Sequence, residues 1–599
     1  MKPVKNRSRQ EIDNRYKWNI EAMYPEESLW EQDFEEVGTL ISLYPSFSGT
    51  LSQSGETLLA AYQKKDKIWL ILERMYVYSR MKKDEDNRLE QYQNMNDRCS
   101  SLVARAASAL SFFTPELLEI RPEQIHQFYE QCPGLETYRF AIDSAFREKA
   151  HILTPAEENI MAQYSEITGA TNNVFSMLNN ADMRFDEITD EKGEKVELTH
   201  GRFIGFMESK DQRVRKEAFQ AMYAPYKAQI NTLAALYNYN TKTDVVQARL
   251  RNYPSSLDAA LSGDNINPEV YFNLVDTVNR NLDSLMRYVQ IRKKLLGLEE
   301  LHMYDVYVPL FDVPQKSVSY EEGVQLMKKG LEALGPDYLE RMEQGVKQGW
   351  VDVYENEGKT SGAYSFGSYD SMPYILMNYN DKLKDVFTLA HEMGHSMHSL
   401  YTRETQPFIY GGHSIFTAEV ASTVNEALMM KQMIADEKDP QIKKYLLNLY
   451  IEEFRSTVFR QTMFAEFELL THNAVERGEA LTSDYLCREY LALVRKYFGP
   501  DVVLDDEIKF EWARIPHFYN AFYVYKYATG FSAAAAISRK ILEEGPVARD
   551  AYIDFLRSGE SDYPIELLKI AGVDMSRPEP IDEAMKIFSG LIDELEALI

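Results

Sequence analysis

This chain of 599 residues is poor in several features that would define its setting. It has only three cysteines, and their scatter along the chain argues against a disulfide framework. No apolar run approaches the roughly 18 residues that a membrane span needs, and the amino-terminal residues are polar. We therefore expect a protein that is neither secreted nor inserted in a membrane and that works in a reducing cytoplasm.

Basic residues are also in deficit. The chain has 66 lysines and arginines against 93 aspartates and glutamates, a net charge of −27. Such an excess of negative charge favours solubility and disfavours phosphate-bearing surfaces as partners. We therefore expect no nucleic acid and no membrane as a partner, and nothing in the sequence indicates the oligomeric state.

Linkers, low-complexity runs and internal repeats are absent too. Length alone would allow about four domains, but without linkers two lobes are the simpler interpretation. What is abundant is the helical periodicity of apolar residues, with few Pro or Gly inside the periodic stretches. The clearest helical patterns cover residues 56–81, 87–112, 155–178 and 436–472. Strand patterns are a hairpin at 183–198 with its turn at 190–193, and short runs at 350–354, 362–366 and 373–379.

One pentapeptide stands out in a chain with only ten histidines: His391-Glu392-Met393-Gly394-His395. Apolar residues flank it at three- and four-residue steps, which predicts a half-buried helix. On a helix, residues four apart share a face, so both imidazoles can reach one metal ion while Glu392 leans toward its open side. This HExxH arrangement is typical of a zinc peptidase. Gly394 weakens such a helix, so we expect another element to pack closely against it.

A catalytic zinc needs a third protein ligand and a free position for water. The best candidate is Glu419, which lies 28 residues after His391 on a second helical pattern. A metal-bound histidine usually donates its other ring N–H to an acceptor, and Glu426 or Ser422 could serve. The predicted metal ligands are therefore His391, His395 and Glu419, holding one Zn²⁺ per chain.

Two other histidines are weighed against this assignment. His398 could reach the same ion only if the helix broke after His395, and no Gly or Pro lies there to break it. His413 lies in a loop with paired glycines, which is typical of a surface or lid position. We expect both histidines to lie outside the metal ligand set.

The segment 391–398, followed by Ala418-Glu419-Val420-Ala421-Ser422, resembles the thimet oligopeptidase family of zinc peptidases, and in particular its oligoendopeptidase F branch. Stretches 15–20, 362–379 and 516–530 extend the resemblance over nearly the whole chain. The resemblance implies a mainly α fold with two helical lobes flanking a deep substrate cleft, and a small β-sheet next to the zinc helix. It implies a helical amino-terminal lobe at 1–200 and a catalytic region at 201–599. It also implies a cytosolic endopeptidase that acts on short peptides.

The tyrosine-rich stretch 517–527 resembles the family's cluster of transition-state donors. Phenol O–H and imidazole N–H groups can stabilise an oxyanion, and we expect His517 and Tyr523 to do so. If the stretch is helical, Tyr519 and Tyr527 share a face with Tyr523, and we name them as weaker candidates for substrate binding. Packing is the alternative for all three, since the chain holds 39 tyrosines.

The expected mechanism follows from these residues. A zinc-activated water attacks the peptide bond, Glu392 acts as its general base, and no covalent intermediate is needed. A strand at 373–379 could pair with an extended substrate, although an ordinary structural sheet gives the same pattern.

Two alternatives remain open. A metallocarboxypeptidase or dipeptidyl carboxypeptidase would need a cation for the terminal carboxylate, and Arg514 and Lys526 are the nearby candidates. A non-catalytic peptide-binding protein with a structural metal is the other, although such a site would have no use for Glu392.

Overall fold

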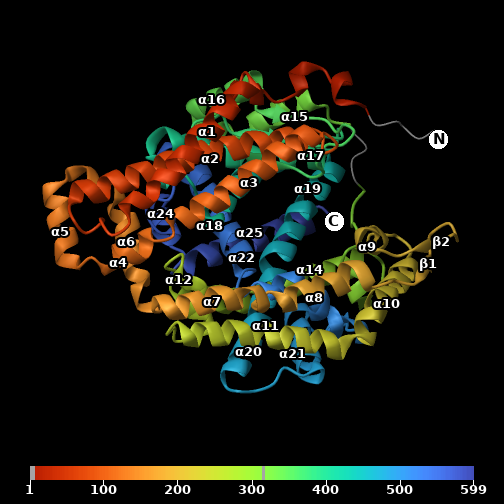
Figure 1. Ribbon diagram of the computed structural model, residues 1–599. Helices are drawn as coiled ribbons and strands as arrows, with labels where there is room; N and C mark the ends of the chain where they lie inside the picture. Colours follow the sequence, from red (N-terminus) through yellow and green to blue (C-terminus); the bar gives the residue numbers. More distant parts are fainter. Residues whose placement is uncertain (1–6, 313–316) are drawn as a thin grey trace. The chain divides into compact units, whose positions relative to one another are not determined.

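The computed structural model describes residues 7–312 and 317–599 and is mainly α-helical, as predicted (Figure 1). The described residues form two compact units, each assembled from three stretches of chain. The first unit contains the described residues up to Lys149, those from 317 to Met433, and Ile537–Val573. The second contains residues 150–312, Ile434–Ala536 and Asp574–Ile599. No helix among the described residues is long and apolar enough to cross a membrane.

The first unit is built on long helices that pack side by side. Helices α1 (Glu27–Leu43), α2 (Gly55–Glu85) and α3 (Glu90–Leu110) contact one another and share a core that includes Trp30, Tyr44 and Met75 (Figure 1). Helix α2 begins where the Ser54 hydroxyl accepts a hydrogen bond from the backbone N–H of Thr57. Further helices of this unit are α4 (Phe113–Glu119), α5 (Pro122–Gln131), α6 (Arg139–Glu148), α15 (Tyr320–Gly330), α16 (Gly335–Gln348), α17 (Leu383–Thr405), α23 (Pro546–Leu556) and α24 (Pro564–Ile570).

A three-stranded sheet lies beside helix α17 in the first unit. Its strands are β4 (Val351–Asp352), β5 (Tyr364–Phe366) and β6 (Tyr374–Leu376), in the order β4-β6-β5. Strand β6 pairs in parallel with β4 and antiparallel with β5, so β5 is an edge strand. The predicted sheet next to the HExxH helix is confirmed, with strands shorter than the sequence pattern suggested.

The second unit is likewise helical. Its helices are α7 (Pro155–Thr168), α8 (Ala170–Met177), α9 (His200–Met207), α10 (Gln212–Ala228), α11 (Ile230–Leu250), α12 (Ser256–Ser262), α13 (Pro268–Arg280), α14 (Leu282–Leu295), α19 (Pro440–Glu453), α20 (Arg460–Glu476), α21 (Ser483–Phe498) and α25 (Glu579–Glu596). Helices α18 (Ile415–Asp436) and α22 (Tyr525–Glu544) include residues of both units. The predicted hairpin is confirmed as β1 (Glu187–Thr189) and β2 (Lys195–Glu197), and two short strands that the sequence did not predict, β3 (Leu301–His302) and β7 (Val502–Val503), pair in parallel.

Two predicted helices differ from the structure. The pattern at 155–178 is divided at Gly169 into α7 and α8. The pattern at 436–472 does not begin at Asp436, because Asp439 caps a new helix, α19, by accepting a hydrogen bond from the backbone N–H of Gln441. That helix continues through a π-helical turn, Phe454–Phe459, into α20. The apolar periodicity continues through both interruptions, so the sequence pattern did not indicate them.

Candidate metal and catalytic site

Two helices of the first unit bring the three predicted metal ligands together. His391 and His395 lie one turn apart on α17, and their Nε2 atoms are 3.2 Å apart. Glu419 lies on α18, with its Oε2 3.6 Å from Nε2 of His391. One potential ligand atom from each of the three side chains falls within 4.8 Å of the others.

Gly394 explains how α17 and α18 come close enough for this. A Cβ atom at Gly394 would lie 2.6 Å from Cα of Ser422 and 2.8 Å from the carbonyl oxygen of Ala421. Real Cβ atoms do not approach backbone so closely, and only glycine lets the two backbones meet here. The close packing expected at this position is therefore confirmed, and it lies on the same short segment as the two histidines.

An acceptor on α18 orients His391. Its Nδ1 lies 3.1 Å from Oε2 of Glu426, so of the two acceptors considered, Glu426 is the partner. With Nδ1 donating to that carboxylate, Nε2 is left as the atom that faces His395 and Glu419. The Ser422 hydroxyl donates instead to Glu419, at 3.0 Å to its backbone carbonyl oxygen and at 3.5 Å to Oε2 of its carboxylate.

The electrostatics of this group favour a bound cation. Burial opposes a charge on His391, but the hydrogen bond that His391 donates to Glu426 and the charges of Glu426, Glu392 and Glu419 outweigh it and raise the pKa of His391 to about 9. Burial and the neighbouring His391 and His413 lower the pKa of His395 to about 3, so that imidazole is neutral. The negative charge gathered here attracts a proton to His391, and a metal ion would compete for the same place.

This donor set fits a divalent metal such as zinc. Two imidazole nitrogens and one carboxylate are a common set of protein ligands at catalytic zinc sites. The hydrogen bond from Nδ1 of His391 to a carboxylate is the support that metal-bound histidines usually have. His391 and Glu419 also retain exposed side-chain fractions of 27% and 41%, so the group is open on one side.

Glu392 lies next to these ligands and is almost fully buried, with 8% of its surface exposed. Burial is the main cause that raises its pKa to about 7; the charge of His391 opposes this rise, and those of Glu419 and Glu426 add to it. The backbone of Ser365, on the edge strand β5, acts in the opposite direction and lowers this pKa. A buried carboxylate thus lies beside the group formed by His391, His395 and Glu419.

The remaining histidines of this region pair with each other. His398 is buried, and its ring stacks on that of His413 with centroids 4.0 Å apart and planes 11° apart. Nε2 of His413 also lies 3.2 Å from the hydroxyl of Ser399. Neither histidine belongs to the group of three potential metal ligands found among the described residues.

His517, Tyr523 and Tyr527 form a separate aromatic cluster in the second unit. The rings of His517 and Tyr523 are nearly parallel, with centroids 6.2 Å apart, and Tyr527 lies 6.0 Å from His517 and 5.4 Å from Tyr523 at nearly right angles to both. Three side chains that can donate hydrogen bonds thus lie together. We call them the His517 cluster.

Tyr519 does not join this cluster. Its ring stacks on Phe175 of α8, with centroids 4.4 Å apart and planes 20° apart. A common helical face for Tyr519, Tyr523 and Tyr527 is wrong, because a 3₁₀ helix ends at Tyr519 and α22 begins only at Tyr525. The irregular turn between them directs Tyr519 elsewhere.

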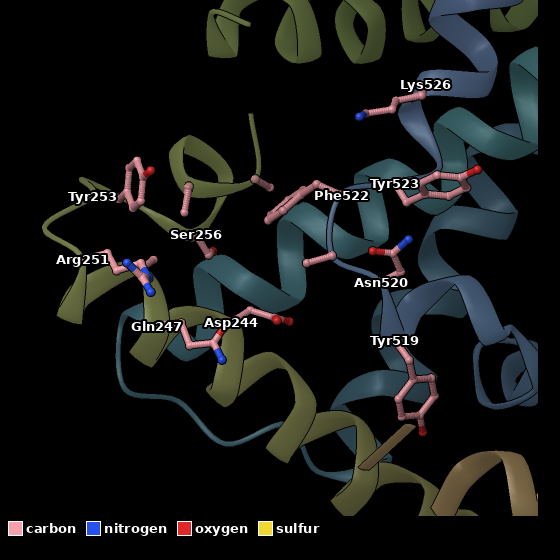
Figure 2. Close-up of a pocket in the computed structure, with 14 residues that line it drawn as sticks. Asp244, Gln247, Arg251, Tyr253, Ser256, Tyr519, Asn520, Phe522, Tyr523 and Lys526 are labelled. Atoms are coloured by element: carbon pink, nitrogen blue, oxygen red, sulfur yellow. The ribbon is translucent and has the colours of Figure 1, made fainter. Parts of the chain in front are cut away.

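That turn contains a residue the sequence did not single out. Phe522 has φ of +53°, a left-handed conformation that costs a non-glycine residue about 1–2 kcal/mol. The side chains of Phe522 and Tyr523 leave the turn in opposite directions (Figure 2). Beside them lies a cavity of about 500 Å³ that is also lined by Asp244, Arg251 and Lys526.

The two cations considered for capturing a substrate carboxylate are already paired. The guanidinium of Arg514 lies 3.3 Å from both Glu511 and the hydroxyl of Tyr223. Nζ of Lys526 lies 2.8 Å from Asp264. Neither cation is free to serve a terminal carboxylate without giving up its partner.

Comparison with known proteins identifies the class. Residues 205–587 match the model of peptidase family M3, which is more than half of the chain, and residues 116–185 match the Oligopeptidase F model. The chain is therefore a peptidase of family M3. The candidate metal ligands His391, His395 and Glu419, called the metal group below, and the His517 cluster both fall within the M3 match.

Full-length relatives place the chain in the oligoendopeptidase F branch of that family, as the resemblance predicted. It is 46% identical to oligopeptidase PepF of Bacillus subtilis, over 99% of this chain and 88% of that one. It is 41% identical to group B oligopeptidase PepB of Streptococcus agalactiae, over 99% and 98%. The crystal structure of oligoendopeptidase-F from Enterococcus faecium matches with a TM-score of 0.74 and 38% identity, over 96% of this chain and 99% of that one.

Proposed function

We propose that this protein is a zinc-dependent endopeptidase that hydrolyses internal peptide bonds of short oligopeptides. The observation that carries the proposal is the group formed by His391, His395 and Glu419, with its ligand atoms within 4.8 Å of one another and the buried Glu392 beside it. The oligopeptidase names of its relatives support the class of substrate.

Under this proposal, His391, His395 and Glu419 hold one zinc ion per chain. A bound zinc ion supplies Lewis acidity, which activates water and polarises a peptide carbonyl group at neutral pH. Glu426 keeps His391 in the tautomer that presents Nε2 to the ion.

Glu392 is the proposed general base. It accepts a proton from the attacking water and passes that proton to the leaving amine as the peptide bond breaks. No covalent enzyme intermediate is required.

The edge strand β5 offers a place for the substrate backbone. Strand β6 occupies one side of β5, and the other edge has N–H and C=O groups that can pair with an extended peptide. Backbone pairing of this kind tolerates many side chains, which suits an enzyme that cleaves varied peptides.

His517 and Tyr523 are the proposed donors to the oxyanion that forms at the attacked carbonyl. Tyr527 is the third member of their cluster and a candidate for substrate binding. Tyr519 is the weakest candidate, since its ring is committed to Phe175.

The proposal also covers the division of the chain. We infer that residues 1–200 form a helical amino-terminal region and that residues 201–599 carry catalysis. Support comes from the two family models, which leave residues 186–204 between them. The compact units interleave along the chain, and neither has a boundary at 200. A cytoplasmic setting stays a prediction from composition.

An endopeptidase is favoured over an exopeptidase because Arg514 and Lys526 are both paired. A pair of internally quenched peptides of about eight residues, one blocked at both ends and one with a free carboxyl terminus, tests this choice. We expect the zinc-loaded protein to cut both peptides at internal bonds. Cleavage of only the free-ended peptide, near its carboxyl terminus, would replace the endopeptidase with a carboxypeptidase or dipeptidyl carboxypeptidase.

A further inference from the structure

A buried carboxyl group holds the turn that precedes Tyr523. Glu468 lies on α20 and has no exposed surface, and its Oε1 accepts a hydrogen bond of 3.1 Å from the backbone N–H of Phe522. Phe522 is the left-handed residue of this turn. The acceptor therefore meets the chain at a residue in an unfavourable left-handed conformation.

The side chain of Phe522 is held as firmly as its backbone. It is buried, and it packs against the ring of His472, with centroids 4.5 Å apart, and against Tyr271, with centroids 5.7 Å apart. His472 in turn contacts the backbone carbonyl of Glu468 through Nδ1 and Asp244 through Nε2. Glu468 and His472, one turn apart on α20, thus fix the backbone and the ring of the same residue.

Glu468 is an unusual choice for an interior position. Its second oxygen, Oε2, has no hydrogen-bond partner among the described residues, although it is buried. Burial raises the pKa of this carboxyl group well above its ordinary value, because a charge is costly in the interior. An apolar residue would fill the space without this unpaired oxygen but would leave the Phe522 N–H without its acceptor.

The conformation of Phe522 decides where Tyr523 goes. Consecutive side chains leave the turn in opposite directions, Phe522 into the interior and Tyr523 to the other side (Figure 2). There the Tyr523 ring lies parallel to that of His517. If Phe522 relaxed to an ordinary negative φ, the following peptide would turn and Tyr523 would leave its place beside His517.

We propose that Glu468 is a positioning residue, whose hydrogen bond to the Phe522 N–H keeps Tyr523 in the His517 cluster. The inference rests on the proposed function, in which Tyr523 stabilises the transition state. Glu468 itself has no role in proton transfer or substrate contact under this proposal.

Variants at this position test the proposal through kcat and KM. Glu468→Leu removes the acceptor at similar volume, and we expect kcat to fall about 10–100-fold with KM within about twofold, because a catalytic group is displaced while substrate binding is kept. Glu468→Gln keeps a side-chain oxygen that can accept from the Phe522 N–H, so it should retain nearly the whole wild-type rate. Glu466→Gln is the matched control: it makes the same change on the same helix, where Glu466 pairs with Lys496 instead, and should leave kcat unchanged.

If Glu468→Leu does not fold, Glu468→Asp serves in its place, since its side chain is one methylene too short to reach the Phe522 N–H. The double variant Glu468→Leu/Tyr523→Phe should be no slower than Tyr523→Phe alone if Glu468 acts through Tyr523. If the losses of kcat in Glu468→Leu and Tyr523→Phe add up in the double variant, the proposal is overturned. A wild-type kcat in Glu468→Leu or Glu468→Asp would also overturn it.

Amide hydrogen exchange over residues 518–526 gives a readout that needs no catalysis. We expect faster exchange at Phe522 in the Leu or Asp variant and wild-type exchange in Glu468→Gln and Glu466→Gln. Unchanged exchange in every variant would show that Glu468 does not hold the turn. If the wild type cleaves no peptide but the variants show the expected differences in exchange, the proposed function is refuted while the role of Glu468 in holding the turn stands.

Discussion

The metal group and the His517 cluster use two different ways of placing side chains. The metal group stands on two regular helices, α17 and α18, that meet at Gly394. The His517 cluster stands on a 3₁₀ helix, an irregular turn and the start of α22. Helical spacing alone aligns His391 with His395. Tyr523 instead follows Phe522, a left-handed residue whose backbone N–H bonds to Glu468 on α20, 54 positions earlier in the chain. Residues on a regular helix can be recognised from a short sequence motif, whereas residues on irregular backbone take positions that depend on contacts far apart in the sequence.

The largest effect should come from breaking the helical group itself. His395→Ala removes one of two imidazoles that face each other at 3.2 Å, and we expect loss of bound zinc and of all measurable cleavage. Zinc content after dialysis, measured by atomic absorption, checks this. His413→Ala is the matched control, since His413 stacks on His398 outside the group, and equal zinc loss in that variant would contradict the ligand assignment.

Removing the hydroxyl of Tyr523 tests the His517 cluster. Tyr523→Phe should retain its zinc and lose about 10²–10³-fold in kcat, as for one missing oxyanion donor. Tyr519→Phe keeps the ring stacked on Phe175, so its kcat should stay close to that of the wild type. A Tyr523→Phe variant with the kcat of the wild type would place the role of the Tyr523 ring in packing and not in catalysis.

A smaller effect is expected at the acceptor that orients His391. Glu426→Gln keeps the shape but removes the charge that faces Nδ1, and we expect about 10–100-fold weaker zinc binding in competition with a chelator. Ser422→Ala is the comparison, since its hydroxyl donates to a backbone carbonyl. A greater loss of affinity in Ser422→Ala than in Glu426→Gln would reverse this assignment.

The smallest effect concerns the contact between α17 and α18. Gly394→Ala forces the two backbones apart, which should cost about 1–3 kcal/mol and exceed the gain of up to about 1 kcal/mol in helix propensity. We expect the melting temperature of the metal-free protein to fall by a few degrees. Gly38→Ala on α1, where nothing lies within 4 Å of the added Cβ, should instead raise it. A stabilising Gly394→Ala would show that the contact is loose.

The contrast between regular helices and irregular backbone also explains how much of the structure could be predicted from the sequence. His391, His395 and the close approach at Gly394 follow from helical periodicity, so they could be predicted, and so could the long helices and the small sheet. The hydrogen bond between Glu468 and Phe522 joins residues 54 positions apart. No local spacing encodes it, and a left-handed phenylalanine has no sequence signature. The place of Tyr519 was misjudged for the same reason.

The breaks in the predicted helices have local causes that periodicity alone overlooks. Asp439 before Pro440 is a helix start that capping preferences could have indicated. The π turn at Phe454–Phe459 adds a residue to the helix without interrupting its apolar face. Such features need the tertiary packing that selects them.

The most direct test of the account compares the wild type with Glu392→Gln, using a doubly blocked, internally quenched peptide and measuring bound zinc in both proteins. The account predicts internal cleavage by the wild type. It predicts that Glu392→Gln holds as much zinc while kcat falls by about 10²–10⁴-fold, because the general base is lost and the ligands are not. A Glu392→Gln variant that keeps both its zinc and its rate would contradict the assignment of Glu392 and the mechanism built on it.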